Sequence, residues 1–252
     1  MDEKFDTPRD LDRLEKSRLI VDMFTRTIVH YGLWFTEVRH QLGMEEALKL
    51  LHRATDKTGK IAMDRLSKVL GFEMDKDLPA PLLDLPHETL DALMEAVAKN
   101  WLVNDGVWFQ AVEFDKDMND AKRCNDSCWG QFSPYEASAV KRFLNLPDRC
   151  GLSGLKKALN FRMYSVINGQ SIVDEGPKSF VFQMNDCRVQ SARKRRGLDD
   201  YPCKSAGLVE YAYFARALDD RIETRCIGCP PDDHPDEWFC AWRFTLEDEV
   251  KT

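Results

Sequence analysis

The sequence predicts an α+β protein, in which a helical N-terminal half precedes an antiparallel module with the element order β-β-α-β-β. Two observations predict this fold class. Between residues 10 and 160, apolar side chains recur at spacings of three and four, the period of a helix with one buried face. After Phe161 the chain is rich in aromatic and β-branched residues, and turn signals such as "NG" and "DEGP" divide it into short segments. We therefore expect a helical region at 1–160 and an α+β module at 161–252.

The helical region is expected to contain several amphipathic helices. The first carries its apolar residues on one stripe, namely Leu11, Leu14, Leu19, Ile20, Met23, Phe24 and Ile28. Three prolines between Asp75 and Pro86 predict a connector, because proline blocks the interior of a helix. A later helix is expected to begin at Ser133. Serine at the N-cap, Pro134 at the first position and Glu136 shortly after it are typical of a capping box.

An internal repeat runs through the helical region. A shift of 74 residues (106 − 32 = 74) places "GLWFTEVRHQLGMEEALK" on "GVWFQAVEFDKDMNDAKR" and aligns Trp34 with Trp108. The repeat predicts two similar helical units, at 19–72 and 93–146, neither of which buries its apolar face alone. We interpret Trp34 and Trp108 as core anchors, with ligand stacking as the alternative.

The C-terminal module is expected to consist of two extended segments, a helix and two further strands. The extended segments are 161–176 and 178–194, and "CKSAGLVEYAYFARALDD" has helical spacing. "RIETRCIGC" and "EWFCAWRFTL" alternate as half-buried strands do, and a proline-rich loop joins them. If this hairpin folds symmetrically about Asp233, Cys226 lies directly opposite Cys240.

Cysteines and one histidine gather near the end of the sequence and allow three interpretations. Cys203, Cys226 and Cys240 could bind a zinc ion. Cys229 or His234 would then be the fourth ligand of a tetrahedral site. Alternatively, Cys226 and Cys240 are core residues, because they share a stripe with aromatic side chains. In the third interpretation Cys229 is a catalytic nucleophile with His234 as its base. The residues alone leave all three open.

Composition excludes some classes of function. The formal net charge of −7 disfavours non-specific binding to nucleic acid. No apolar run approaches the roughly 18 residues of a membrane span, and the polar N-terminus predicts no secretory signal, so we expect a cytoplasmic protein with reduced cysteines.

Residues 188–196 form a basic block that we expect to be a loop, either solvated or docking an anionic ligand or partner.

A resemblance to known families begins in the segment from Cys187 to Phe244. Cys203 with "SAGLVEYAYFARAL", then "IETRCIGC" and "FCAWRF", resemble the 4-vinyl reductase-type domain. The whole chain resembles prokaryotic cytosolic proteins of a domain-of-unknown-function family, with kinship to the L-2-amino-thiazoline-4-carboxylic acid hydrolase-like family. The resemblance implies an α+β module that holds a hydrophobic ligand, or a metal through Cys203, Cys226 and Cys240.

These observations together predict a cytosolic small-molecule binding or sensor protein. Its pocket would be apolar and lined by aromatic residues, with Trp34, Trp108, Tyr211 and Trp242 as candidates. One alternative is a hydrolase that uses a cysteine nucleophile or a metal-activated water. Another is a non-catalytic protein that docks a partner through the 188–196 block. The sequence is also compatible with a homo-oligomer.

Overall fold

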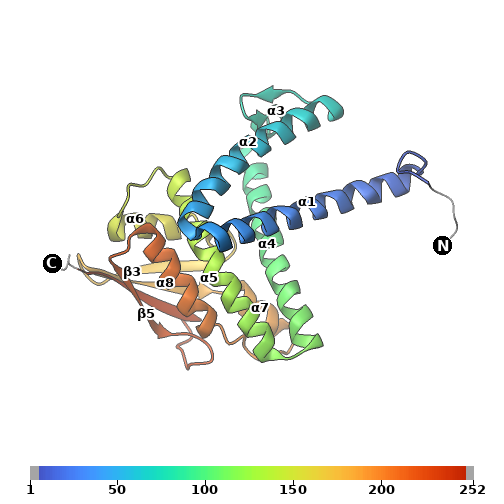
Figure 1. Cartoon of the computed structure of the whole chain (residues 1–252). Coiled ribbons are helices and arrows are strands. Elements are labelled where there is room, and N and C mark those ends of the chain that lie inside the picture. The colour runs from blue at the N-terminus through green and yellow to red at the C-terminus, as the bar shows by residue number, and fades with distance from the viewer. Residues whose placement is uncertain (1–5, 248–252) are drawn as a thin grey trace. The chain divides into compact units, whose positions relative to one another are not determined.

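The computed structural model describes residues 6–247. The chain divides into two compact units, Met1–Asp84 and Leu85–Thr252, and each is described by itself. Helices make up the N-terminal half, and a four-stranded antiparallel sheet follows them in the sequence (Figure 1). The predicted α+β fold class is therefore confirmed. None of the described helices combines the length and the apolar character that crossing a bilayer requires.

The first unit is a hairpin of two long helices followed by a small β-ribbon. Its elements are α1 (Arg13–Leu42), α2 (Met44–Leu70), β1 (Met74–Asp75), β2 (Leu78–Pro79) and α3 (Ala80–Leu83). The Asp12 side chain accepts a hydrogen bond from the Glu15 amide at 2.8 Å and caps the start of α1. Gly43, at φ 85°, separates the two helices at a backbone conformation that few other residues adopt. The hydroxyl groups of Tyr31 and Thr58, 2.5 Å apart, connect α1 to α2.

The second unit contains the large sheet and the helices that cover it. Its helices are α4 (His87–Asp115), α5 (Met118–Phe143), α6 (Gly151–Leu159), the short 3-10 helix η1 (Met163–Val166), α7 (Arg188–Arg195) and α8 (Lys204–Leu218). Its strands are β3 (Gly169–Asp174), β4 (Ser179–Asp186), β5 (Ile222–Gly228) and β6 (Cys240–Leu246). They are ordered β3-β4-β6-β5, and every neighbouring pair is antiparallel.

The core of the second unit lies between one face of this sheet and helices α5, α6 and α8. On the sheet, Phe182 pairs with Trp242 and Phe180 with Phe244, so these four side chains share the covered face. Phe214 of α8 packs into the same fully buried cluster. Rings of such size contribute roughly 1.5–3 kcal/mol each on full burial. The apolar period of α8 therefore fixes which side of the helix lies on the sheet.

Helix α5 is continuous from Met118 to Phe143, so the predicted helix start at Ser133 is wrong. The Ser133 hydroxyl donates to the Trp129 carbonyl at 2.7 Å, one turn earlier, rather than capping a new helix. Pro134 lies within the helix. Residues on the buried stripe of α5, at spacings of three and four, are Ala121, Asn125, Trp129, Ser133, Ala137 and Val140. Packing of this stripe outweighs the local capping signal.

The basic block at 188–196 is a helix, not the predicted loop. Arg188–Arg195 form α7, and Arg196 follows as its C-cap. Gln190 is fully buried and anchors the helix, since its side chain bonds the Tyr201 backbone at both N–H and C=O. The module therefore reads β-β-α-α-β-β.

The predicted register of the last hairpin is also wrong. Cys226 lies opposite Trp242 rather than opposite Cys240. The register shifts between Cys226 and Gly228, where β5 has one residue more than β6. Such an extra residue is not visible in the alternation of the sequence, because the alternation of each strand is regular on its own.

The two helical hairpins have matching bounds at the offset of the repeat. Adding 74 to α1 gives 87–116, against His87–Asp115 for α4, and adding 74 to α2 gives 118–144, against Met118–Phe143 for α5. Ala47 and the equivalent Ala121 are both 1% exposed. These bounds support the interpretation of a duplicated helical hairpin.

The core-anchor interpretation of the two repeated tryptophans is wrong. Trp34 is 62% exposed on α1, and Trp108 is 70% exposed on α4. Sequence spacing shows that each lies in an apolar stripe, but not whether another element covers that stripe.

Candidate functional site

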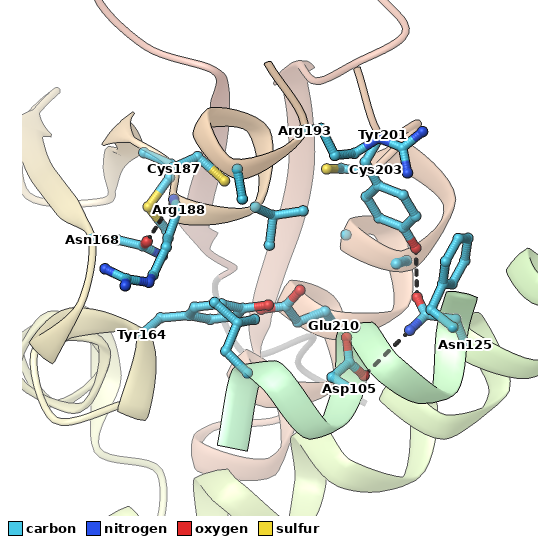
Figure 2. Close-up of a pocket in the computed structure, with 18 of the residues that line it drawn as sticks. Asp105, Asn125, Tyr164, Asn168, Cys187, Arg188, Arg193, Tyr201, Cys203 and Glu210 are labelled. Carbon is cyan, nitrogen blue, oxygen red and sulfur yellow. Dashed lines mark hydrogen bonds between the residues drawn. The ribbon is translucent and has the colours of Figure 1, made fainter. Parts of the chain in front are cut away.

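The second unit contains an open cavity of about 280 Å³. Its walls are α4, α5, α7 and α8, together with η1 and the adjoining ends of the sheet (Figure 2). Much of the wall is apolar, with Leu102, Phe109, Trp129, Tyr211 and Trp242 among the lining residues. A mostly apolar concavity with a few polar groups is typical of small-molecule sites.

A chain of polar side chains runs along one wall. The Tyr201 hydroxyl donates to the Asn125 Oδ1 atom at 2.7 Å, and the Asn125 amide lies 3.4 Å from the Asp105 carboxylate (Figure 2). Lys122 donates to the Tyr201 hydroxyl at 3.0 Å. Burial raises the pKa of Asp105, while Asn125 and Lys122 partly oppose that effect. Asp105 is therefore a carboxyl group that lacks the hydration it would have at the surface.

Arg162 holds two carboxylates beneath the cavity. Its guanidinium lies 2.8 Å from Glu136 and 2.7 Å from Glu210, and all three side chains are buried. Burial raises the pKa of Glu210, and Arg162 opposes this shift. The Tyr164 ring lies across the cavity beside Glu210 (Figure 2). Burial, followed by the Glu210 charge, raises the pKa of Tyr164, which keeps its hydroxyl protonated.

Four cysteines line the cavity. The Cys229 thiol shares hydrogen bonds with the thiols of Cys203 and Cys240, and Cys187 is close enough to interact electrostatically with both of these. The Gln190 amide also donates to the Cys203 sulfur at 3.1 Å.

The irregularity in β5 explains why Cys229 belongs to this group. In a regular ladder continued from Cys226, Gly228 would face Cys240 and Cys229 would turn to the other side of the sheet. The extra residue, Ile227, instead places Gly228 opposite Ala241. Cys229 therefore follows on the covered side, beside Cys240.

The environment of these thiols disfavours the thiolate. Hydrogen bonds that the Cys229 thiol donates to Cys203 and Cys240, followed by burial, raise the pKa of Cys229, and burial raises the pKa of Cys187. His234 packs against Trp238 and Phe239 and does not line the cavity. The arrangement thus gives no support to Cys229 as a nucleophile with His234 as its base.

The residues predicted to hold zinc are only partly brought together. Cys203, Cys229 and Cys240 converge, whereas Cys226 and His234 do not line the cavity. Within residues 6–247, no group of three or more histidine, cysteine or acidic side chains is arranged to hold a metal ion. Zinc binding stays a prediction.

The basic helix α7 contributes arginines to the cavity. Arg188, Arg193 and Arg196 are lining residues. Arg193 is held in place, because its Nε atom donates to the Asp199 carbonyl at 2.7 Å. In Figure 2 Arg193 lies on the opposite side of the cavity from Asp105, whereas the Arg188 side chain lies near Asn168 and Tyr164.

Two of the four predicted ligand-binding aromatics line the cavity. Tyr211 and Trp242 do so and stack on each other with centroids 4.9 Å apart. Trp108 is not a lining residue, and Trp34 belongs to the first unit.

Sequence reasoning missed most of the polar lining, although one signal was present. Asn125 interrupts the apolar stripe of α5, and Glu210 interrupts that of α8. A polar residue on a buried helical face must have a partner, and is therefore a marker of an internal site.

Alkylation should distinguish these thiols from a reactive pair. Iodoacetamide at neutral pH is expected to modify the exposed Cys124 before Cys229, which is 1% exposed. Each unit of raised pKa lowers the thiolate fraction about tenfold, so we expect a rate difference of about tenfold or more. Peptide mass spectrometry over a time course measures both rates. Preferential labelling of Cys229 would instead support the nucleophile interpretation.

The fold and cavity define an α+β protein with an open, largely apolar cavity covered by helices on one face of an antiparallel sheet. A family model, described as a family of unknown function (DUF6125), matches residues 9–87 and 83–246. The chain belongs to this family. The two matches start 74 residues apart (83 − 9 = 74), which is the offset of the helical repeat. Comparisons with curated proteins and with solved structures find no match.

Proposed function

We propose that this protein binds a small molecule in the cavity of its second unit. The cavity itself carries the proposal: a space of about 280 Å³ lies beside buried aromatic rings, with ionisable groups converging on it. Its size is close to the lower end of ligand sites, which begin at about 300 Å³. The function is also the one that the predicted resemblance of residues 187–244 to the 4-vinyl reductase-type domain would imply, and that resemblance stays a prediction.

A structural reason supports binding over simple packing. Asp105, Tyr164 and Glu210 are ionisable groups whose raised pKa values reflect lost hydration. Placing such groups around an open space lowers the stability of the fold, and perturbed ionisable groups of this kind cluster at functional sites.

We also propose a cytoplasmic location, because all eight cysteines are free, as a reducing compartment favours.

Filling the cavity should abolish binding of a neutral probe. Gly106 lines the cavity, and a Cβ atom added there meets no other atom within 4 Å. The variant Gly106→Phe is therefore expected to fold and to obstruct the space. Saturation-transfer NMR with indole at millimolar concentration should show contact with the wild-type protein and at least a fivefold weaker signal with the variant (about 1 kcal/mol).

The repeat supplies a matched control. Gly32 is the equivalent of Gly106 in α1, where an added Cβ also meets nothing within 4 Å, and it belongs to the first unit. Gly32→Phe should leave the indole signal unchanged. Equal signals from both variants, or none from the wild-type protein, would contradict a binding function for the cavity.

A further inference from the structure

We propose that the ligand is amphoteric: a small, largely apolar molecule with a cationic group at one end and an anionic group at the other. This inference rests on the proposed function, because it concerns the same cavity. It follows from the opposite charges on two facing walls, which a ligand with a single charge would not match.

The first wall carries an excess of carboxylates. Asp105 and Glu210 line the cavity, and Glu136, which does not line it, shares the Arg162 guanidinium with Glu210. Three carboxyl groups are therefore accompanied by one guanidinium. Lys122, which also acts on Asp105, is itself paired with Asp126 at 3.1 Å.

Glu210 lines the cavity and is only 7% exposed. Its Oε1 atom is ion-paired with the Arg162 guanidinium at 2.7 Å, and Glu136 shares that guanidinium, so one cation serves two buried carboxylates. A buried carboxylate that shares its cation is expensive, and a donor group from a ligand would relieve part of that cost. The Asp105 carboxylate, with one long bond to Asn125, offers a second acceptor. A protonated amine or amidine has the donors that both of these groups require.

The facing wall is basic. Helix α7 and its C-cap contain Arg188, Arg193, Lys194, Arg195 and Arg196 and no acidic residue. The guanidinium of Arg193 is partly occupied by Asp199 and Glu113. Arg188 and Arg196 line the cavity and have exposed side chains. Guanidinium groups pair well with carboxylates and phosphates, so this wall suits an anionic group.

The side chains between these two walls determine the chemical character of the middle part of the ligand. Leu102, Phe109, Tyr211 and Trp242 line it, so the part between the charged ends should be apolar. An anion without a cation would leave the carboxylate wall unmatched, and a cation without an anion would make no use of the arginines. The observations therefore favour a ligand with both.

Three probes with one phenyl body test the charge requirement. The probe 4-(aminomethyl)phenylacetate carries a cation and an anion at opposite ends of the ring, 4-methylbenzylamine carries only the cation, and 4-methylphenylacetate carries only the anion. Isothermal titration calorimetry on the full chain is expected to give 4-(aminomethyl)phenylacetate an affinity about tenfold higher than that of either of the others, because each charged end adds a charge-assisted hydrogen bond.

Charge-neutralising variants assign each end to its wall. Asp105→Asn should weaken the binding of 4-(aminomethyl)phenylacetate and 4-methylbenzylamine about tenfold and leave that of 4-methylphenylacetate unchanged. The double variant Arg188→Gln/Arg196→Gln should weaken the binding of 4-(aminomethyl)phenylacetate and 4-methylphenylacetate and leave that of the amine unchanged. Asp115→Asn, on an exposed side chain of α4, and Lys194→Gln/Arg195→Gln, outside the lining of the cavity, are the matched controls and should change none of the affinities.

The outcomes separate this inference from the proposed function. If indole binds but 4-(aminomethyl)phenylacetate binds no more tightly than the two singly charged probes, the ligand is not selected as amphoteric and the inference is wrong. The same conclusion follows if the controls weaken binding as much as the lining variants. If indole and all three charged probes fail to bind, the proposed function is overturned as well.

Discussion

Replacing Arg162 with methionine is expected to lower the free energy of unfolding of the second unit by about 3–5 kcal/mol at pH 7. Arg162 is 2% exposed and lies between the buried carboxylates of Glu136 and Glu210. Burial lowers the pKa of Arg162, but the two carboxylates raise it by more, so the guanidinium stays charged. Without it, two buried carboxylates repel each other with no compensating cation. Urea unfolding followed by circular dichroism, with hydrogen exchange of α8 peptides, measures the loss.

The loss of stability caused by Arg162→Met should be smaller at lower pH. Burial raises the pKa of Glu210 in the folded protein, and removal of Arg162 raises that pKa further. The folded state then binds a proton that the unfolded state, with an ordinary pKa of about 4.3, releases. The stability of the variant therefore increases as the pH falls toward the unfolded-state pKa. Its loss of stability relative to the wild-type protein should be smaller at pH 5 than at pH 8.

Two further variants test the cause of the Arg162 effect. Arg123→Met removes an exposed arginine paired with Asp120, and it should cost less than about 1 kcal/mol. Adding Glu136→Gln and Glu210→Gln to Arg162→Met should recover part of the stability, because the unpaired charges are gone. A triple variant as unstable as the single one would assign the loss to packing rather than to charge.

Replacing Trp242 with alanine is the second change with a large expected effect, about 3–5 kcal/mol. The Trp242 side chain is fully buried, stacks on Tyr211 and approaches α8 so closely that a Cβ atom added at Gly207 would lie 2.4 Å from it. Its removal leaves a void that the rigid sheet and α8 cannot close. Urea unfolding monitored by circular dichroism measures the difference.

The matched control is Trp108→Ala on the exposed side of α4. A residue that is 70% exposed contributes little buried area, so this change should stay within about 0.5 kcal/mol. Comparable losses from the two tryptophans would show that Trp108 is covered in solution.

Much of the fold could be predicted because its signals are local. The period of three and four fixed the positions of the long helices, and alternation identified the strands that contain Cys226 and Cys240. The failures depended on tertiary contacts instead. Ser133 has the local signature of a helix start, but packing of α5 keeps the helix intact across Pro134. The arginines of α7 suggested a loop, but the buried Gln190 fixes a helix there.

The candidate site was harder to predict because segments far apart in the sequence build it. Cys203 and Cys240 could be paired by reasoning about one end of the sheet. Asp105 and Asn125 could not, since their role depends on how α4 and α5 pack beside α7. Lining residues from α4 to β6 become neighbours only in the folded second unit.

Strand β5 has one residue more than the segment of β6 with which it pairs, and that extra residue is Ile227. Deleting that residue would leave an uninterrupted ladder, with Cys226 still opposite Trp242 and Gly228 still opposite Ala241. Loss of a residue elsewhere in the strand would instead move the side chains of part of the strand to the opposite face of the sheet. A variant of this chain that lacks Ile227 would therefore keep the same sulfur atoms beside the cavity.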